Sequence, residues 1–417
     1  MMARFAYTLL LILLLPWALL HLLLRGRRQP EYLRHWGERF GLFGARPEQP
    51  VIWIHAVSVG ETRAAQPLVA ELSKRYPDHR LLFTHMTPTG RETSVALFGD
   101  AVDRIYLPYD TPWAVGRFLA HFRPAFGLIM ETELWPNLVA ACRSRGIPLL
   151  LVNARLSERS ARRYGRWPTL SRMTLRGLTA IAAQGENDAV RLREIGAPEV
   201  AILGNMKFDI EPPPAQLALG RELRAAIGDR PLLLCASTRE GEEALILDAW
   251  PHDTNVLLAI VPRHPQRFNE VAAMVAARGL SVRRRSAHEA PTSDTQVWLG
   301  DSMGELFAWY EAADVAFIGG SLLDYGSQNL IEACAVGTPV LLGPSTFNFA
   351  DAAREALAAG AALKVNAAAG LVREALALIR DTTRRTAMAD FGRAFAARHR
   401  GATARTMKII EEVWPQG

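Results

Sequence analysis

The sequence predicts an α/β protein built from two doubly wound domains that face a cleft, preceded by an N-terminal membrane-anchor helix. Short apolar runs alternate with helical stretches in two separate series, which is the pattern of parallel sheets covered by helices on both faces. The chain has 417 residues, enough for two to three domains. Between the two series lies a proline-rich segment, Glu211–Pro214, that suits a linker.

The composition is that of a globular protein, with 49% hydrophobic and 22% charged residues. The net charge of +6 favours anionic partners such as nucleotide phosphates, lipid headgroups or nucleic acid. The three cysteines, Cys142, Cys235 and Cys334, are far apart and lie among apolar residues. Their spacing excludes a disulfide framework and a cysteine metal site, and indicates buried thiols in a reducing compartment.

The first 28 residues contain the strongest single signal in the sequence. Phe5–Leu24 is a run of twenty uncharged residues, eleven of them leucine, with Arg4 before it and Arg25, Arg27 and Arg28 after it. A helix of about 20 residues spans the roughly 30 Å hydrocarbon core of a bilayer. A cleaved signal peptide is the alternative, but no small-residue cleavage site follows the run. The arginine excess on the C-terminal side predicts a single-pass anchor with the body of the protein in the cytoplasm.

The remaining chain is expected to form domains 29–210 and 211–390 and a C-terminal helical segment, 391–417. Because ligands of doubly wound sheets bind at the carboxyl ends of the strands, the functional side chains should lie in the loops that follow the strands. The first series predicts strands at Val51–Ile54, Leu81–Thr84, Gly127–Met130, Leu149–Val152, Ala180–Ala183 and Val200–Leu203. The second predicts strands at Leu232–Ala236, Val256–Val261, Val297–Leu299, Val315–Ile318 and Val340–Leu342.

Glu61 follows the first predicted strand and falls at the start of a helix. A carboxylate at a strand end can take a proton from an attacking hydroxyl, a role worth roughly 10²–10⁴-fold in rate. Ser58 and Glu61 also have the S-x-x-E spacing of a capping box, in which the carboxylate only stabilises the helix start. The spacing leaves both interpretations open, and the two are compatible.

Glu131 and Glu133 directly follow the buried run Gly127–Met130 and precede a Trp-Pro turn. Two carboxylates at one strand end are candidates for chemistry, and a solvated helix start is the alternative. Lys207 follows the last predicted strand of the first half and can reach the same edge of the sheet.

A basic segment from Arg155 to Arg176 carries seven arginines, with Tyr164 and Trp167 among them. This mixture suits a membrane interface or the phosphates of a lipid headgroup. A solvated helix face is an equally good interpretation, whereas the membrane anchor argues against single-stranded nucleic acid.

In the second half, Ala316–Asp351 joins an apolar run to the glycine pair Gly319-Gly320 and then to a helical pattern near Asn329. Such a turn leaves backbone N–H groups free at the positive end of a helix dipole, which suits a phosphate, and Glu332 can accept from ribose hydroxyls. Ordinary glycine turns are the alternative. Asn329 and Glu332 also have the capping-box spacing.

Two further loops offer nucleotide contacts. Pro262 and Arg263 end a predicted strand, and a glycine turn, Met303-Gly304-Glu305, comes shortly before the Ala316–Asp351 segment. The sequence has no D-x-D triplet and no His/Cys cluster with metal-ligand spacing. We therefore expect no metal or other cofactor; arginines, Lys207 and helix N-termini would carry the charge of a leaving group.

Taken together, eight motifs resemble those of the 3-deoxy-D-manno-octulosonic acid (Kdo) transferases, which are GT-B glycosyltransferases. They run in order from about Val51 to Asp351: VSVGE, METELWPN, NARLSERS, GNMKFD, VPRHPQRF, GDSMGEL, GGSL followed by QNLIEA, and GPSTFNF. The resemblance implies two Rossmann-like domains in the GT-B fold, with the last helix crossing back onto the first domain. It also implies inverting, metal-independent transfer of Kdo from CMP-Kdo to the lipid A precursor, lipid IVA, on the cytoplasmic face of the inner membrane.

Carried over by position, Glu61 matches the general base of this family, and Glu131 and Lys207 match residues that stabilise the transition state. The resemblance assigns nucleotide contacts to Pro262, Arg263, Met303, Gly304, Glu305, Asn329, Leu330, Ile331 and Glu332. The sequence departs from the family pattern at two places. Ser345 stands where the last motif often has His, so no histidine role is assigned there. Ser327-Gln328 precede Asn329 where the family often has Gly-His; since Gln can still donate to a phosphate, we expect activity to be retained and donor affinity or the number of sugars added to differ.

Two other functions remain open at the level of sequence. One is a membrane-associated GT-B enzyme with a different nucleotide sugar or lipid acceptor. The other is a non-catalytic lipid- or nucleotide-binding protein on the same scaffold, although such a protein has no need for a base at Glu61. The expected partners are CMP-Kdo, the lipid A precursor and inner-membrane lipids, and not nucleic acid.

Overall fold

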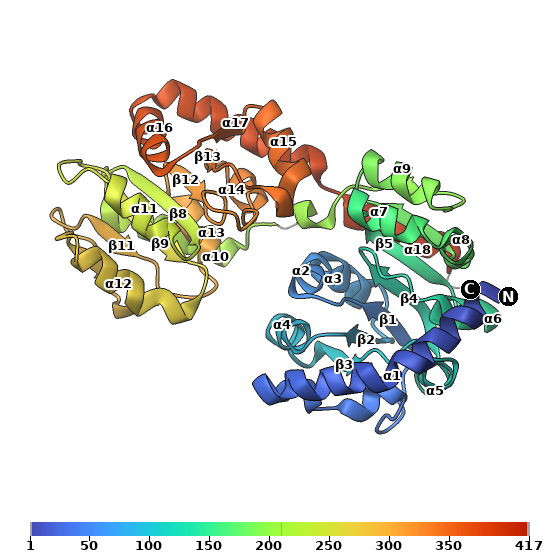
Figure 1. Ribbon diagram of the computed structural model, residues 1–417. Helices are drawn as coiled ribbons and strands as arrows, with labels where there is room; N and C mark the ends of the chain where they lie inside the picture. Colours follow the sequence, from blue (N-terminus) through green and yellow to red (C-terminus); the bar gives the residue numbers. More distant parts are fainter. Residues whose placement is uncertain (1, 210, 415–417) are drawn as a thin grey trace. The chain divides into compact units, whose positions relative to one another are not determined.

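The structure is a computed structural model that describes residues 2–209 and 211–414 (Figure 1). The chain divides into two compact units, Met1–Asp209 with Arg400–Gly417, and Ile210–His399. The predicted boundary at residue 210 and the end of the predicted segment 391–417 lie outside the described residues. The predicted boundary after residue 390 falls inside one continuous helix of the second unit, and the chain returns to the first unit only at Arg400.

The first unit is a parallel sheet with helices on both faces. Its strands are β1 (Val51–His55), β2 (Arg80–His85), β3 (Val102–Tyr106), β4 (Pro124–Met130), β5 (Leu149–Ala154), β6 (Ala180–Ala183) and β7 (Ala201–Ile202). Its α-helices are α1 (Met2–Arg28), α2 (Val59–Ala64), α3 (Gln66–Arg75), α4 (Pro88–Phe98), α5 (Pro112–Phe122), α6 (Pro136–Ser144), α7 (Glu158–Gly165), α8 (Pro168–Leu175), α9 (Glu186–Glu194) and α18 (Ala402–Val413). Short 3₁₀ turns are η1 (Pro30–Leu33), η2 (Trp36–Phe40), η3 (Gly99–Ala101) and η4 (Met206–Asp209).

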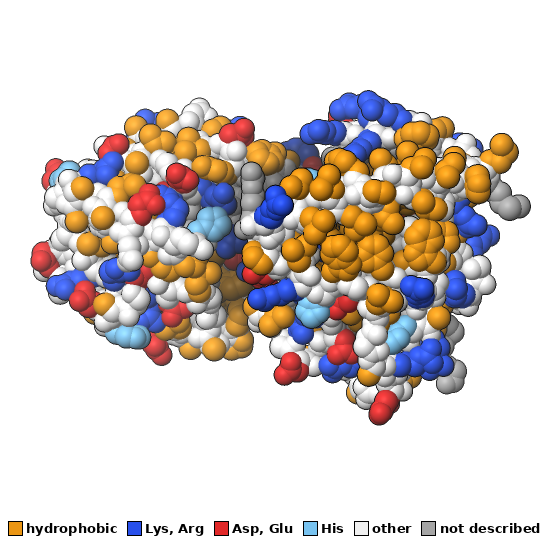
Figure 2. Space-filling view, turned by 60° about the horizontal axis from the view of Figure 1, so that its bottom comes forward, with side chains coloured by type: hydrophobic (Ala, Val, Ile, Leu, Met, Phe, Trp, Pro, Cys, Tyr) orange, Lys and Arg blue, Asp and Glu red, His pale blue; other side chains and the backbone are white. Residues whose placement is uncertain are grey.

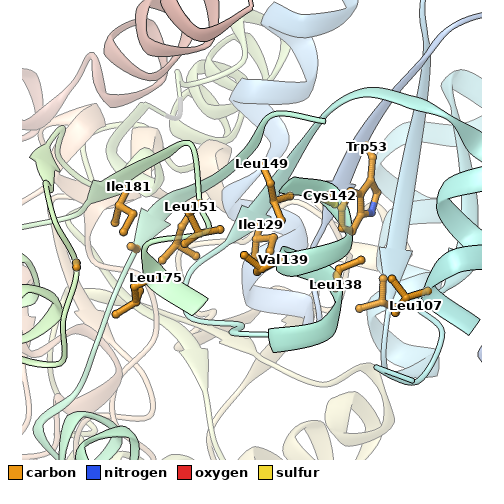
Figure 3. Packing of buried hydrophobic residues seen from close by; sticks show 14 of the residues in the cluster. Trp53, Leu107, Ile129, Leu138, Val139, Cys142, Leu149, Leu151, Leu175 and Ile181 are labelled. Carbon is orange, nitrogen blue, oxygen red and sulfur yellow. The ribbon is translucent and has the colours of Figure 1, made fainter. Parts of the chain in front are cut away.

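The strand order of this sheet is β3-β2-β1-β4-β5-β6-β7, so the direction of winding reverses between β1 and β4. Alternate side chains of β1 enter two different cores, as the pleat of a strand requires. Trp53 packs with α5 and α6 on one face, where Figure 3 shows it beside Cys142 and Leu149, whereas Ile52 and Ile54 pack on the other face. Gly127 makes room for Trp53, because a Cβ there would lie 2.5 Å from the indole ring.

The second unit repeats this plan. Its strands are β8 (Leu232–Thr238), β9 (Leu257–Pro262), β10 (Val282–Arg284), β11 (Val297–Leu299), β12 (Val315–Ile318), β13 (Val340–Leu342) and β14 (Ala362–Lys364), in the order β10-β11-β9-β8-β12-β13-β14. Its α-helices are α10 (Pro214–Ile227), α11 (Glu242–Ala249), α12 (Phe268–Ala276), α13 (Leu306–Ala312), α14 (Ile331–Val336), α15 (Ala350–Ala358), α16 (Ala368–Arg380) and α17 (Thr382–His399), with 3₁₀ turns η5 (Pro265–Arg267), η6 (Arg285–Ala287) and η7 (Phe347–Phe349). Here the winding reverses between β8 and β12.

The structure contains strands at all the predicted apolar runs and three strands that the sequence analysis missed, β3, β10 and β14. All three lie at the edge of a sheet. An edge strand is less buried, and its polar residues, such as Asp103 and Arg104 in β3, interrupt the apolar run that identifies a central strand.

The C-terminal helix α18 completes the first unit. Ala402, Met407 and Ile410 are buried in the same core as Ile52 and Ile54. The Asp209 carboxylate accepts hydrogen bonds of 2.5 Å from the backbone N–H groups of Gly401 and Thr403, so it holds the start of this helix beside η4.

Helix α1 belongs to the first unit and contacts η1, α6 and α8. It is long and apolar enough to cross a membrane and very little of it is buried, features that membrane spans, signal sequences and interfacial helices can share. Eleven large hydrophobic side chains of the helix are exposed, among them Phe5, Leu13 and Trp17. Figure 2 shows a broad hydrophobic face on this unit with basic side chains along its border.

Candidate active site

The sheet topology identifies where each unit is suited to bind a ligand. In a doubly wound sheet the loops at the carboxyl ends of the strands separate where the winding reverses, and ligands bind there. In the first unit this point lies between β1, which leads to Glu61, and β4, which leads to Glu131. In the second unit it lies between β8 and β12, next to the glycine loop that begins at Gly319.

Glu61 caps helix α2 and also carries a strongly perturbed carboxyl group. The Ser58 hydroxyl accepts a hydrogen bond from the Glu61 N–H at 3.4 Å and donates to Glu61 Oε1 at 3.0 Å, while Oε2 accepts from the Val57 N–H at 2.5 Å. Burial raises the pKa of Glu61 to about 7, the negative charge of Glu131 adds to the effect, and these hydrogen bonds oppose it. A carboxylate with this pKa is suited to accept a proton near neutral pH.

Glu131 and Lys207 form an ion pair at the same edge of the sheet. Lys207 Nζ lies 3.4 Å from Glu131 Oε1, and both side chains are 20% exposed. Glu131 has a φ of +55°, a left-handed conformation that costs a non-glycine residue about 1–3 kcal/mol and that is common at functional sites. Its backbone N–H still donates to Val152 O at 3.0 Å, so the strained residue continues the pairing of β4 with β5.

Two further residues belong to this site: Glu133, which the sequence offers with Glu131 as a candidate for chemistry, and Asn153, to which no role was assigned from the sequence. Desolvation, followed by the charge of Glu61, raises the pKa of Glu133 to about 7, so Glu133 is a second partly buried carboxyl group beside the first. Asn153, near the end of β5, has a φ of +51° and accepts a hydrogen bond from the Met206 N–H at 3.0 Å. Asn153 therefore fixes the start of η4, the turn that carries Lys207.

The glycine loop of the second unit differs from the prediction. Its N–H groups are not free for a phosphate, because the Gly320 and Leu322 N–H groups donate to the two oxygens of Glu242, at 2.6 and 2.9 Å. Glu242 is fully buried, and burial raises the pKa of its carboxyl group while these hydrogen bonds oppose the shift. Gly319 is required for close approach, since a Cβ there would lie 2.4 Å from Ser237 O.

The predicted nucleotide-binding residues around this loop lie at the carboxyl edge of the second sheet. Pro262 ends β9, and Arg263 Nε donates to Gln328 Oε1 at 3.1 Å, which ties this strand end to the segment before Asn329. Gln328 thus holds Arg263, and the N–H of Ser327 donates to Gly320 O at 2.7 Å, so both residues make contacts within the site where the family often has Gly-His.

The capping box predicted at Asn329 takes a different form. Helix α14 begins at Ile331, after Leu330, and Leu330 makes no side-chain capping bond. Asn329 Oδ1 accepts from the Ile331 N–H, and Asn329 Nδ2 donates to Glu332 Oε1, both at 3.0 Å. Asn329 and Glu332 thus contact each other as side chains.

The Met303-Gly304-Glu305 turn precedes α13. Met303 is 58% exposed, and Gly304 adopts a φ of +82°. Glu305 is held by Arg285, which donates two hydrogen bonds of 3.0 and 3.1 Å to its carboxylate. Ser345, the second departure from the family pattern, accepts from the Gly326 N–H and donates to Asp324, so it closes the loop on itself.

Within residues 2–209 and 211–414, no group of three or more His, Cys, Asp or Glu side chains is arranged to hold a metal ion.

Comparisons with known proteins are consistent with this geometry. Residues 34–210 match the profile of the family described as 3-deoxy-D-manno-octulosonic-acid transferase (kdotransferase). The chain is 46% identical to the 3-deoxy-D-manno-octulosonic acid transferase of Bordetella pertussis over 428 residues, covering 99% of each chain. It is 39% identical to the protein of the same name from Haemophilus influenzae over 423 residues, covering 98% of each.

Among solved structures, a glycosyltransferase from Rickettsia africae superposes with a TM-score of 0.59 at 12% identity, covering 89% of this chain and all of that one. At this identity the likeness concerns the fold alone. Together with the two parallel sheets it confirms the predicted GT-B class.

Proposed function

The chain belongs to the Kdo transferase family, and on that premise we propose that it transfers Kdo from CMP-Kdo to the lipid A precursor, lipid IVA. That the protein is a glycosyltransferase follows from its family. The donor, the acceptor, the inversion at the anomeric carbon and the residue roles are the proposal. The observation that carries it is Glu61, a partly buried carboxyl group with a pKa of about 7 beside the Glu131–Lys207 pair.

In the proposed reaction Glu61 accepts the proton of the acceptor hydroxyl as that oxygen attacks the anomeric carbon of Kdo. The bond from this carbon to the CMP phosphate breaks on the opposite face, so configuration inverts and CMP leaves with the electron pair. General-base assistance of this kind contributes typically 10²–10⁴-fold. The Lys207 ammonium, next to Glu131, supplies positive charge to the anionic transition state in the first unit.

We assign the donor nucleotide to the carboxyl edge of the second sheet, through Pro262, Arg263, Met303–Glu305 and Asn329–Glu332. Because Glu242 occupies the N–H groups of the glycine loop, the phosphate charge is neutralised mainly by arginine side chains such as Arg263. No metal ion takes part in this scheme.

Membrane attachment is part of the proposal. The apolar helix α1 and the basic border of the same unit support attachment to the cytoplasmic face of the inner membrane, where a lipid acceptor is available.

The test is transfer in detergent by the purified full-length protein, with lipid IVA, CMP-Kdo and a chelator present. Mass spectrometry should show the acceptor gaining one or more Kdo units. The matched variant is Glu61→Gln, which retains an oxygen to accept from the Val57 N–H and so preserves the helix cap, but cannot take a proton.

We expect Glu61→Gln to lose activity by at least about 10²-fold. Full activity in this variant would reduce Glu61 to a helix cap. Donor binding without transfer by the wild type would refute the proposed acceptor and favour another lipid, and loss of transfer on chelation would contradict the metal-free scheme.

A further inference from the structure

Helix α1 is apolar enough to cross a bilayer, but its first turns are fastened to the folded unit. The Tyr7 hydroxyl donates to Asp110 Oδ2 at 3.1 Å, and Thr8 Oγ1 lies 2.9 Å from Asn137 Nδ2. Asp110 and Asn137 are 1% and 6% exposed, so these are contacts with the ordered interior of the unit and not with a mobile surface chain.

The other end of α1 is held on the same unit. Gly26 packs against Leu33 of η1, and η2 follows directly. From η2, Glu38 accepts a hydrogen bond from the Tyr106 N–H at 2.7 Å, while the Arg39 guanidinium lies 4.1 Å from the centre of the Tyr106 ring. The first turns of the helix therefore contact the unit directly, and its C-terminal end is tied to β3 through η1 and η2.

The positions between the two ends show that one side of α1 lies against protein along its length. Between Arg4 and Gly26 every partly or fully buried position falls near one stripe, at residues 4, 7, 8, 11, 15, 18, 19, 22 and 26, and every other position in that range is exposed. Spacings of three and four residues place these positions on one helix face. A lipid-surrounded span has no reason to show such a stripe.

These contacts are incompatible with a crossing. Thr8 and Gly26 are 18 residues apart, which corresponds to about 27 Å along a helix, close to the roughly 30 Å thickness of the hydrocarbon core. If α1 crossed, Asp110 and Asn137 would have to follow Thr8 to the far side of the bilayer. The exposed Arg143, on the same helix as Asn137, and Arg145, directly after that helix, would then enter the membrane at a high energetic cost.

We propose that α1 lies in the plane of the membrane, with its exposed face among the acyl chains of one leaflet and its stripe against the protein. The protein is then monotopic, in place of the single-pass anchor that the sequence predicts. This inference rests on the proposed membrane attachment, but not on the reaction or on any catalytic residue.

The charges around α1 fit an anionic leaflet. Arg4 lines two grooves at the start of the helix, one shared with Arg145 and the other with Arg143. Helix α8 contacts α1, and the Arg155–Arg176 segment that contains α7 and α8 exposes six arginines and Trp167 against one acidic residue. Arginines beside an apolar helix bind headgroup phosphates at the depth of the interface.

The placement of α1 also explains how a lipid substrate meets the site. The Asp110 carboxylate that holds Tyr7 also accepts from the Asn137 and Leu138 N–H groups, at 2.9 and 2.7 Å, and so caps α6. Helix α6 begins five residues after Glu131. Helix α1 is thus bonded through Asp110 to the start of α6, and only the short loop between Glu131 and Pro136 separates α6 from the end of β4.

The test uses single cysteines in the full-length protein, because Cys142, Cys235 and Cys334 are all fully buried. Ala3→Cys is exposed to a membrane-impermeant maleimide in intact spheroplasts and again after permeabilisation, with Arg27→Cys as the cytoplasmic control. An in-plane helix leaves both positions unlabelled until the membrane is opened. Labelling of Ala3→Cys in intact cells, with Arg27→Cys protected, would establish a span and overturn the proposal.

A second measurement probes the docking itself. In membranes, Thr8→Cys with Asn137→Cys should be joined by a short bis-thiosulfonate cross-linker, whereas the control pair Leu10→Cys with Asn137→Cys should not, since Leu10 faces away from the unit. Equal cross-linking of the two pairs, or of neither, would refute the docked helix. Failure of the wild type to sediment with membranes would instead refute the proposed attachment.

Discussion

Neutralising Glu131 should lower the pKa of Glu61 and shift the pH dependence of transfer. The pKa of Glu61 is raised from 4.5 to about 7 by burial and then by the negative charge of Glu131. In Glu131→Gln the second cause disappears while burial, the larger cause, remains. Because Lys207 at 3.4 Å already neutralises part of the Glu131 charge, we expect a decrease of roughly one pKa unit, which at acidic pH is about tenfold in the ionised fraction of Glu61.

Lys207→Met provides the opposite perturbation at the same ion pair. Removing the ammonium group leaves the Glu131 charge uncompensated, so the pKa of Glu61 should rise above about 7. The acidic limb of the pH–rate profile, where activity rises with pH, should then move to higher pH. In the proposed reaction both variants also lose transition-state stabilisation, and each profile is therefore scaled to its own plateau.

The assay is kcat in mixed micelles at saturating donor and acceptor, from about pH 5 to about pH 9, where the acidic limb reports the ionisation of the base in the complex. Displacement of the limb in opposite directions by the two variants would support the coupling. Limbs that stay together, or that move in the same direction, would show that the limb does not report a Glu61 carboxylate sensing Glu131.

Three further predictions concern binding and stability. Arg267→Met should lower the free energy of unfolding, measured by urea titration, by about 3–5 kcal/mol. The reason is that the fully buried Glu243 loses the guanidinium that contacts both of its carboxylate oxygens at 2.8 Å. A loss no larger than that caused by Arg263→Met would contradict this prediction. Arg263→Ala should raise KM for the donor about tenfold and leave the acceptor KM unchanged, and equal effects on both would exclude a nucleotide contact. The pKa of Glu61 is higher in the folded state, so the stability of the wild type falls as pH rises from about 4.5 through about 7. Glu61→Gln has no such loss, so thermal scans should show it to be more stable than the wild type at about pH 8, with a smaller difference in stability at about pH 5.

Much of the first site could be predicted because its residues directly follow buried strands. Glu61 and Glu131 come after β1 and β4, whose uninterrupted apolar residues identify them as central strands. The sequence could not decide between a helix cap and a base at Glu61, and the structure shows that the capping bonds and the raised pKa occur together. The raised pKa of Glu133 depends on how the loop packs around it, which no local pattern encodes, although its spacing from Glu131 was a visible signal.

The second unit shows where local sequence patterns are insufficient. The glycine loop suggested free N–H groups because its own residues offer no partner. The partner, Glu242, lies 78 residues earlier in the chain than Gly320 and reaches the loop only because β8 and β12 are neighbours in the sheet. The edge strands β3, β10 and β14 were not predicted for the same reason, since they are defined by pairing with a distant strand and not by their own composition.

The Glu242 contact has a consequence for the dynamics of donor binding. A loop whose amides are bonded to a buried carboxylate has the same shape with and without a ligand, so it has little conformational freedom left to lose when a nucleotide arrives. Amide hydrogen exchange at Gly320 and Leu322 should therefore be slow already in the free enzyme and should change little on saturation with CMP. The glycines of this loop then act as a rigid template, and the ordering that accompanies binding must occur in the arginine side chains around it.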